Sequence, residues 1–177
     1  HGRNPVLADA LKRVGLAERS GRGVDRIFEG SLMYGRDLPD YSESTSTSVR
    51  LFIPRGMPDK RMVKLISEEQ QKTGVPISLN ALFVLNVLKH NRRMSLSEIC
   101  SECNISESKL RSTVERLAEA GIIDGIGTGR GRAYVLSAKV YNDPAQYVRQ
   151  TDIDVIRYTE LILKLAQTKE YLTRKDV

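Results

Sequence analysis

The stretch from Ser106 to Ala120 holds the residue types and spacing that point most clearly to chemistry. Helical periodicity places Leu110, Val114 and Leu117 on one inner side. The outward side then carries Ser108, Lys109, Ser112 and Arg116, with Arg111 beside them and Ser106 at the start of the helix. Small hydroxyl side chains let a helix approach DNA closely, and arginine can form two hydrogen bonds to guanine. We therefore expect this helix to enter the major groove of duplex DNA as a recognition helix.

The sequence Gly127-Thr-Gly-Arg-Gly-Arg132 lies between two short apolar stretches and predicts the tip of a β-hairpin. Alternating glycines let such a tip bend and lie close to the backbone of a ligand. Thr128, Arg130 and Arg132 are therefore candidate contacts to DNA phosphates or to the minor groove. The simpler alternative is a flexible, solvated hairpin whose arginines only increase solubility.

Three acidic residues oppose DNA binding by the predicted recognition helix. Glu115 and Glu119 fall on its later turns, which usually leave the groove, but Glu107 falls on its first turn. A second interpretation therefore stays open, in which the same helices contact another protein or a second copy of this chain.

Cys100 and Cys103 have the spacing of a zinc-binding pair, but the sequence has no second cysteine pair and only two histidines, His1 and His90. Both cysteines fall on the apolar side of a helix, so we expect buried, structural thiols and no metal site. The sequence also lacks a Walker loop, a dinucleotide-binding fingerprint and any nucleophile–base set. We therefore expect no cofactor and no enzymatic activity in this chain.

The elements that must position the candidate residues follow the order helix, helix, helix, hairpin. The sequence predicts helices over 60–72, 79–89, 95–103 and 106–120, and strands over 122–126 and 133–136. Ser95 and Ser106 are the expected caps of the last two helices, and Gly121 is the expected stop. This order is typical of a winged helix-turn-helix, which we assign to residues 57–138.

A smaller group of elements is expected over residues 1–56. Asn4 is placed to cap a helix that has Pro5 at its first position and ends before Gly15. A second helix is expected over 24–34, with Ile27, Phe28, Leu32 and Met33 facing inward, and a strand over 49–53. The polar sequence from Ser42 to Ser48 is the one stretch that looks disordered.

The final residues repeat an earlier pattern. Residues 81–99 align without gaps on residues 159–177, with apolar positions and a helix cap, Ser95 or Thr173, at matching places. We interpret residues 139–177 as a linker followed by the truncated start of a second winged helix. Two unrelated amphipathic helices are the alternative.

Composition sets wider limits. The 177 residues carry a formal net charge of +6, which agrees with a nucleic-acid partner but is shared by many other proteins. No apolar run is long enough for a membrane span, and no secretory leader is recognisable, so we expect a cytoplasmic protein with no membrane partner. Because the chain starts at His1 and runs directly into a helical pattern, we expect it to be part of a longer protein.

Two segments near the start, Arg3-Asn-Pro-Val-Leu-Ala8 and Gly15-Leu-Ala-Glu-Arg-Ser-Gly-Arg-Gly23, carry a family resemblance. They resemble the end of the ATPase-like domain of bacterial RecG-like transcriptional regulators, the Schlafen/AlbA-type domain family. The resemblance implies a DNA-binding domain upstream and winged helices downstream. It does not imply helicase activity, because no helicase motor motif occurs in this sequence.

The same resemblance bears on nucleotide binding. In the related histidine-kinase-type ATPase fold, a glycine-rich turn before a helix helps to hold phosphates, and Ser20–Val24 would be that turn. The metal-holding asparagine and the Asp-x-Gly-x-Gly segment of that fold do not occur in this sequence. We therefore expect nucleotide binding only if an upstream part of a longer protein supplies the rest of the site.

The expected fold class is thus α+β and mostly helical, a winged helix-turn-helix preceded by a small helix-helix-strand part of an ATPase-like domain. The expected function is that of a DNA-binding transcriptional regulator fragment, with duplex DNA bound by helix 106–120 and by wing 122–137. A homodimer that matches two half-sites is a further expected arrangement. The alternative is an assembly or dimerisation module of a larger ATP-dependent or defence-related protein.

Overall fold

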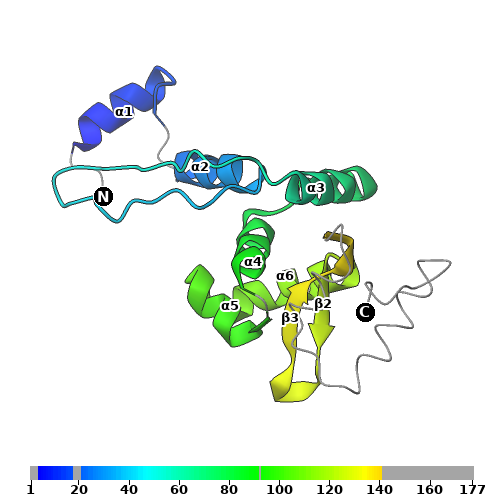
Figure 1. The fold of residues 1–177 in the computed structure, drawn as a ribbon. Helices are drawn as coiled ribbons and strands as arrows, with labels where there is room; N and C mark the ends of the chain where they lie inside the picture. Colours follow the sequence, from blue (N-terminus) through cyan, green and yellow to red (C-terminus); the bar gives the residue numbers. More distant parts are fainter. Residues whose placement is uncertain (1–3, 18–20, 92, 141–177) are drawn as a thin grey trace. The chain divides into compact units, whose positions relative to one another are not determined.

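The computed structural model describes residues 4–17, 21–91 and 93–140. The chain separates into two compact units, the N-terminal unit of residues 1–59 and the winged-helix unit, which begins at Lys60. The boundary lies three residues beyond the expected one after residue 56. Each unit is described by itself (Figure 1).

The described part of the N-terminal unit contains two helices. Helix α1 (Pro5–Arg13) begins as predicted, because the Asn4 side chain accepts a hydrogen bond from the Leu7 amide at 3.1 Å. Helix α2 (Arg22–Leu32) starts two residues earlier than predicted, directly after the left-handed residue Gly21. Leu32 is buried, but the expected inward position of Met33 is wrong, because that side chain lies beyond the end of α2 and is exposed.

The strand expected over residues 49–53 does not form. Only Phe52 pairs, in an isolated antiparallel bridge in which its amide and carbonyl both bond to those of Asp40 at 2.9 Å. A β-branched run becomes a strand only when a neighbour supplies a ladder of hydrogen bonds, and the described residues supply one rung.

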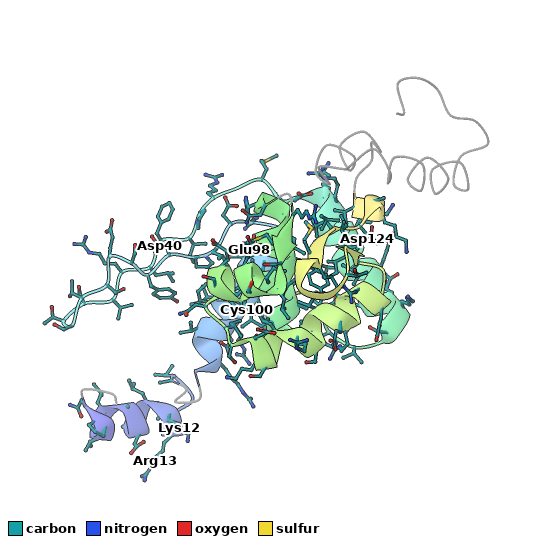
Figure 2. All side chains as sticks on the ribbon, turned by 90° about the horizontal axis from the view of Figure 1, so that it is seen from below. Lys12, Arg13, Asp40, Glu98, Cys100 and Asp124 are labelled. Atoms are coloured by element: carbon teal, nitrogen blue, oxygen red, sulfur yellow. The ribbon has the colours of Figure 1, made fainter. Side chains whose placement is uncertain are left out.

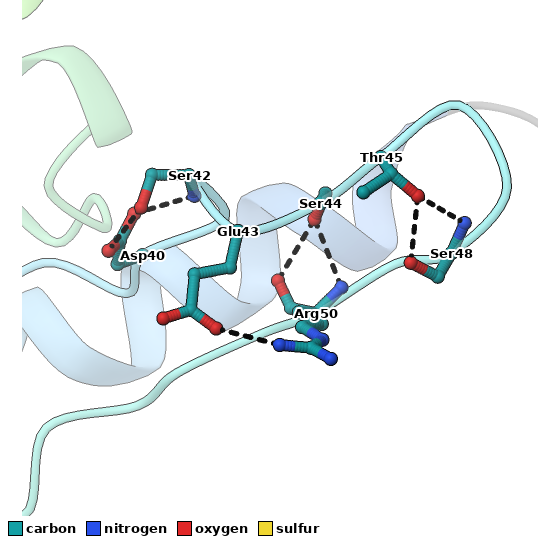
Figure 3. Close-up of polar contacts among 7 residues, drawn as sticks. All are labelled: Asp40, Ser42, Glu43, Ser44, Thr45, Ser48 and Arg50. Carbon is teal, nitrogen blue, oxygen red and sulfur yellow. Dashed lines mark hydrogen bonds and ion pairs between the residues drawn. The ribbon is translucent and has the colours of Figure 1, made fainter.

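The polar loop before it has a defined hydrogen-bond network, contrary to expectation. Ser42 donates to the Asp40 carboxylate through both its amide and its hydroxyl, at 2.7 and 2.8 Å (Figure 3). These bonds, the backbone one first, lower the pKa of the Asp40 carboxyl. Farther along, Ser44 exchanges hydrogen bonds with the backbone of Arg50, and Thr45 bonds to Ser48. Short hydroxyl side chains thus replace backbone pairing within the loop.

The winged-helix unit has the predicted order of elements, and the predicted fold class, α+β and mostly helical, is confirmed. Its helices are α3 (Lys60–Thr73), α4 (Leu79–His90), α5 (Leu96–Cys103) and α6 (Glu107–Glu119). Its strands are β1 (Met94–Ser95), β2 (Ile123–Ile126) and β3 (Ala133–Leu136), joined in the antiparallel order β1-β3-β2. Strand β1 is not among the predicted elements, because two residues are too few to show an alternating pattern.

One apolar core joins these elements. The largest completely buried side chains come from α4, α5, α6 and the sheet: Leu82, Val84, Leu85, Leu88, Ile99, Leu110, Val114, Ile123 and Val135. Helix α4 is buried on nearly all sides and contacts α5, α6 and β3, so it is the centre of the unit. Helix α3 buries Met62, Leu65 and Ile66 and contacts the short 3-10 helix η2 (Ala138–Val140) that follows the sheet.

Two of the predicted features, the C-terminal repeat and the glycine-rich turn, lie wholly or partly outside the described residues. The repeat at residues 159–177 lies outside them, as does Ser20 of the glycine-rich turn. Across the described ranges, no helix is both long enough and apolar enough to cross a lipid bilayer.

Candidate nucleic-acid interface

A short turn between α5 and α6 sets the start of the candidate recognition helix. Helix α5 opens with a reciprocal cap, in which the Ser95 amide donates to Glu98 at 2.7 Å and the Glu98 amide donates to the Ser95 hydroxyl at 3.3 Å. The Ser95 amide and then its hydroxyl lower the pKa of the Glu98 carboxyl. Asn104 ends the helix in the left-handed region with φ 51°. Glu98 and Cys100 both project from α5 (Figure 2).

Helix α6 presents the outward side that its spacing predicts. Leu110 and Val114 are completely buried, and Leu117 is nearly so. The six candidate side chains of this segment are all exposed: Ser106, Ser108, Lys109, Arg111, Ser112 and Arg116. Ser106 has the backbone conformation of a cap, but its hydroxyl makes no capping bond and lies 3.3 Å from the Ser108 hydroxyl. The expected capping role of the Ser106 side chain is therefore wrong, and its hydroxyl stays at the surface.

Charges divide the exposed side of α6 into two flanks. Arg111 forms an ion pair with Glu107 one turn earlier, and both side chains are at least half exposed. Such a pair is worth no more than about 1 kcal/mol, so a phosphate can compete for Arg111. Within the described residues, no carboxylate pairs with Lys109 or Arg116. These two cations therefore form the more available flank.

The wing is a closed turn between β2 and β3. Gly127 has φ +86°, and a Cβ there would lie 2.9 Å from the Gly131 carbonyl oxygen, so only glycine fits. The short 3-10 helix η1 (Gly129–Gly131) follows, closed by the Arg132 amide bonding to the Gly129 carbonyl at 3.2 Å. Thr128 is exposed at the start of this turn. The position of the Arg130 side chain is outside the structural description.

Arg132 is exposed, but its guanidinium lies against the sheet. Its central carbon is 5.3 Å from the centre of the Tyr134 ring, a cation–π arrangement. Tyr134 is itself buried in β3 and pairs directly with Gly125 in β2. A cation is thus fixed at the base of the wing.

Net charge is concentrated in this part of the chain. Residues 60–140 contain thirteen lysines and arginines and eight acidic residues, so they carry +5 of the formal net charge of +6. A local excess of cations attracts a polyanion, and it does so most strongly at low salt.

The two cysteines lie on α5, behind this surface. They are free thiols and only partly buried, so the expectation of buried cysteines is wrong. Burial raises the pKa of the Cys103 thiol to about 11, and burial followed by the charge of Glu107 raises that of Cys100. Among the described residues, no group of three or more histidine, cysteine or acidic side chains could hold a metal ion.

Comparison with known proteins gives two separate matches along the chain. Residues 1–53 match the family model described as "Putative ATP-dependent DNA helicase recG C-terminal". Residues 84–124 match the model described as "Winged helix-turn-helix DNA-binding", which supports a DNA-binding role for the surface built from α5, α6 and β2. No curated protein matches the chain.

Among solved structures, the chain is similar to the DIP2311 protein from Corynebacterium diphtheriae. The TM-score is 0.61 at 20% sequence identity, over 87% of this chain and 30% of that one. The chain therefore spans less than a third of the length of this structural relative, and the likeness concerns the fold alone. Together the matches identify an N-terminal region similar to the C-terminal part of RecG-like proteins, followed by a winged helix-turn-helix.

Proposed function

We propose that this chain is the DNA-binding part of a cytoplasmic transcriptional regulator. Helix α6 reads base edges in the major groove through Lys109, Arg111 and Arg116, while its serines allow close approach. The wing binds the phosphate backbone through Thr128, Arg130 and Arg132. The main support is the exposure of all six candidate side chains of the Ser106–Arg116 segment above a fully buried apolar side.

Glu107, the acidic residue on the first turn of α6, does not remove this support. Glu107 engages Arg111 within the helix, so much of its charge is balanced before DNA arrives. Lys109 and Arg116 lie on the other flank, at a spacing of seven residues, or about two turns. A recognition helix that lies in the major groove over its first turns has about this length in contact with DNA.

The alternative, an assembly module, has support from a different part of the molecule. Large apolar side chains in the N-terminal unit are exposed, among them Val6 at 79% and Phe52 at 67%. By contrast, residues 76–140 expose no large apolar side chain among those described. Protein contacts are therefore favoured for the N-terminal unit, and DNA contacts for α6 and the wing.

Nucleotide binding belongs to a longer protein in this proposal. Helix α2 begins at Arg22 after Gly21, so a glycine stands at the start of a helix as in phosphate-binding turns. The other parts of a nucleotide site would come from a longer chain, and no enzymatic activity is assigned to this one.

Fluorescence anisotropy with a random duplex, titrated at about 50 to 200 mM salt, tests the proposal. We expect a steep salt dependence. The double variant Arg130→Ala/Arg132→Ala should bind all sequences more weakly and lose roughly 1.8 units of salt slope, about 0.9 for each phosphate. Lys109→Ala/Arg116→Ala should also change the sequence preference.

Lys60→Ala/Lys72→Ala is the matched control, because it removes two exposed cations from α3, outside the proposed surface. It should leave the binding close to that of the wild type. Equal binding by the wild type and both double variants of the proposed surface at low salt would refute the proposal. Gel filtration of the same samples tests the alternative, which predicts a stable oligomer without affinity for DNA.

A further inference from the structure

Arg132, Tyr134 and Gly125 share one face of the wing sheet. The strand register places Gly125 directly opposite Tyr134. Side chains alternate between the two faces of a strand, so Arg132, two residues before Tyr134, falls on the same face. Gly125 and Arg132 are therefore diagonal neighbours, a relation within reach of a long side chain.

The Arg132 guanidinium occupies the place that a side chain at position 125 would take. A Cβ built on Gly125 would lie 2.8 Å from both Nε and Nη2 of Arg132 and 3.2 Å from Cζ. The Cζ atom of the same group lies 5.3 Å from the centre of the Tyr134 ring. The guanidinium thus lies close to both an aromatic ring and a bare stretch of backbone, with its Nε–Nη2 edge toward Gly125.

Space, and not backbone conformation, explains the glycine at position 125. Gly127 needs a left-handed φ and meets the Gly131 backbone, whereas Gly125 has an ordinary φ that any residue adopts. A glycine inside a strand weakens the strand and often marks a close approach by another group. Here the approaching group is a cationic side chain.

We propose that Gly125 and Tyr134 are positioning residues that hold Arg132 as a preorganised ligand for a DNA phosphate. The inference rests on the proposed function of the wing. The edge that carries Nε and Nη2 faces Gly125, so the N–H groups of Nη1 are left to donate to a phosphate oxygen. Because the side chain is already ordered, binding costs less conformational entropy than it would with a free arginine.

The variant Gly125→Ala changes the position of the Arg132 guanidinium and keeps its charge. The new methyl group displaces only the flexible end of Arg132, so we expect the fold to remain and the guanidinium to leave the ring. Duplex affinity in the full chain should fall about threefold because ordering is lost. The salt slope should stay unchanged, since the cation is still present. Arg132→Ala should instead lower both the affinity and the slope, the latter by about 0.9.

Gly131→Ala is the matched control, because it adds the same methyl group to the same wing in open space, with no left-handed φ. It should bind like the wild type. Tyr134→Leu removes the ring and should reproduce the effect of Gly125→Ala, whereas Tyr134→Phe keeps the ring and should retain binding. The double variant Gly125→Ala/Arg132→Ala should bind like Arg132→Ala alone.

A measurement without DNA tests the position itself. In the free wild-type chain, the ring current of Tyr134 should shift the Nε–H resonance of Arg132, assigned by its loss in Arg132→Lys. Gly125→Ala should remove that shift, and Gly131→Ala should keep it. The inference would be overturned if the Arg132 Nε–H resonance had the same chemical shift in the wild type and in Gly125→Ala.

The two proposals fail in different ways. A clear loss of affinity in Arg132→Ala, with wild-type affinity in Gly125→Ala, would overturn the positioning role and leave the proposed function intact. Unchanged affinity in Arg132→Ala would remove Arg132 from the DNA-binding surface, and with it the role of both positioning residues.

Discussion

The two units of this chain differ in how far they bury their apolar side chains. In the winged-helix unit, α4, α5, α6 and the sheet enclose a core whose central leucines are inaccessible to solvent. In the N-terminal unit, α1 buries none of its residues, and the segment around Phe52 forms a single β-bridge. Hydrophobic burial is the main driving force of folding, so we expect the winged-helix unit to be stable by itself and the N-terminal unit to have little stability of its own.

The largest expected effect comes from separating the units. A fragment of residues 60–140 should keep its helical spectrum and unfold in one cooperative transition, because its core is complete. A fragment of residues 1–59 should show no cooperative transition, because its apolar side chains have too little to pack against. Circular dichroism melting of both fragments is the measurement. Cooperative unfolding of residues 1–59 would refute the comparison.

Single leucines give the next largest contrast. Leu110→Ala in α6 should lower the free energy of unfolding of the winged-helix unit by about 2 to 5 kcal/mol, because the residue is fully buried. Leu7→Ala in α1 should cost less than about 0.5 kcal/mol, because that side chain is 55% exposed. Urea denaturation of the full chain compares them, and similar costs would mean that α1 is packed in solution.

Helix caps give a smaller contrast. Ser95→Ala breaks the reciprocal cap of α5 and should cost the winged-helix unit about 1 kcal/mol. Asn4→Ala removes the cap of α1 and should only increase local fraying, seen as faster amide exchange in residues 5–8. An Asn4→Ala effect on the main unfolding transition as large as that of Ser95→Ala would show that α1 belongs to the same cooperative unit.

The smallest effect expected is a pH dependence confined to the winged-helix unit. Cys103 has a pKa of about 11 in the folded state, above its ordinary value of 9.0. Its stabilising contribution is therefore complete below about pH 9 and is lost as the pH rises toward 11. The Tm of the wild type should fall in this window by roughly 2 °C or less relative to Cys103→Ala. A wild-type Tm that rises relative to the variant would contradict the raised pKa.

The sequence predicted the parts of the fold that follow from periodicity. Helices with regular apolar spacing, such as α5 and α6, were located within one or two residues, and at α5 a strong cap also marked the start. The strand over 49–53 was wrong because composition cannot say whether a pairing partner exists. Strand β1 was missed because its pairing with β3 comes from tertiary contact and not from its two residues.

The candidate site was predictable only as a set of residue types. Spacing identified the exposed side of α6, since the same rule that buries Leu110 exposes Lys109 and Ser112. The pairing of Arg111 with Glu107 follows from their spacing of four residues, which brings the two side chains together on one side of a helix. The placement of Arg132 against Tyr134 needed the strand register, which links residues of β2 and β3 only after folding.

The contact between α3 and η2 has a mechanical consequence. Only Ser137 separates η2 from β3, and its amide bonds to the Ile122 carbonyl just before β2. The first helix of the unit therefore touches the chain one residue beyond the strand that carries the wing. A change in the tilt of α3 would therefore reach the β2–β3 hairpin through the few covalent bonds that join η2 to β3.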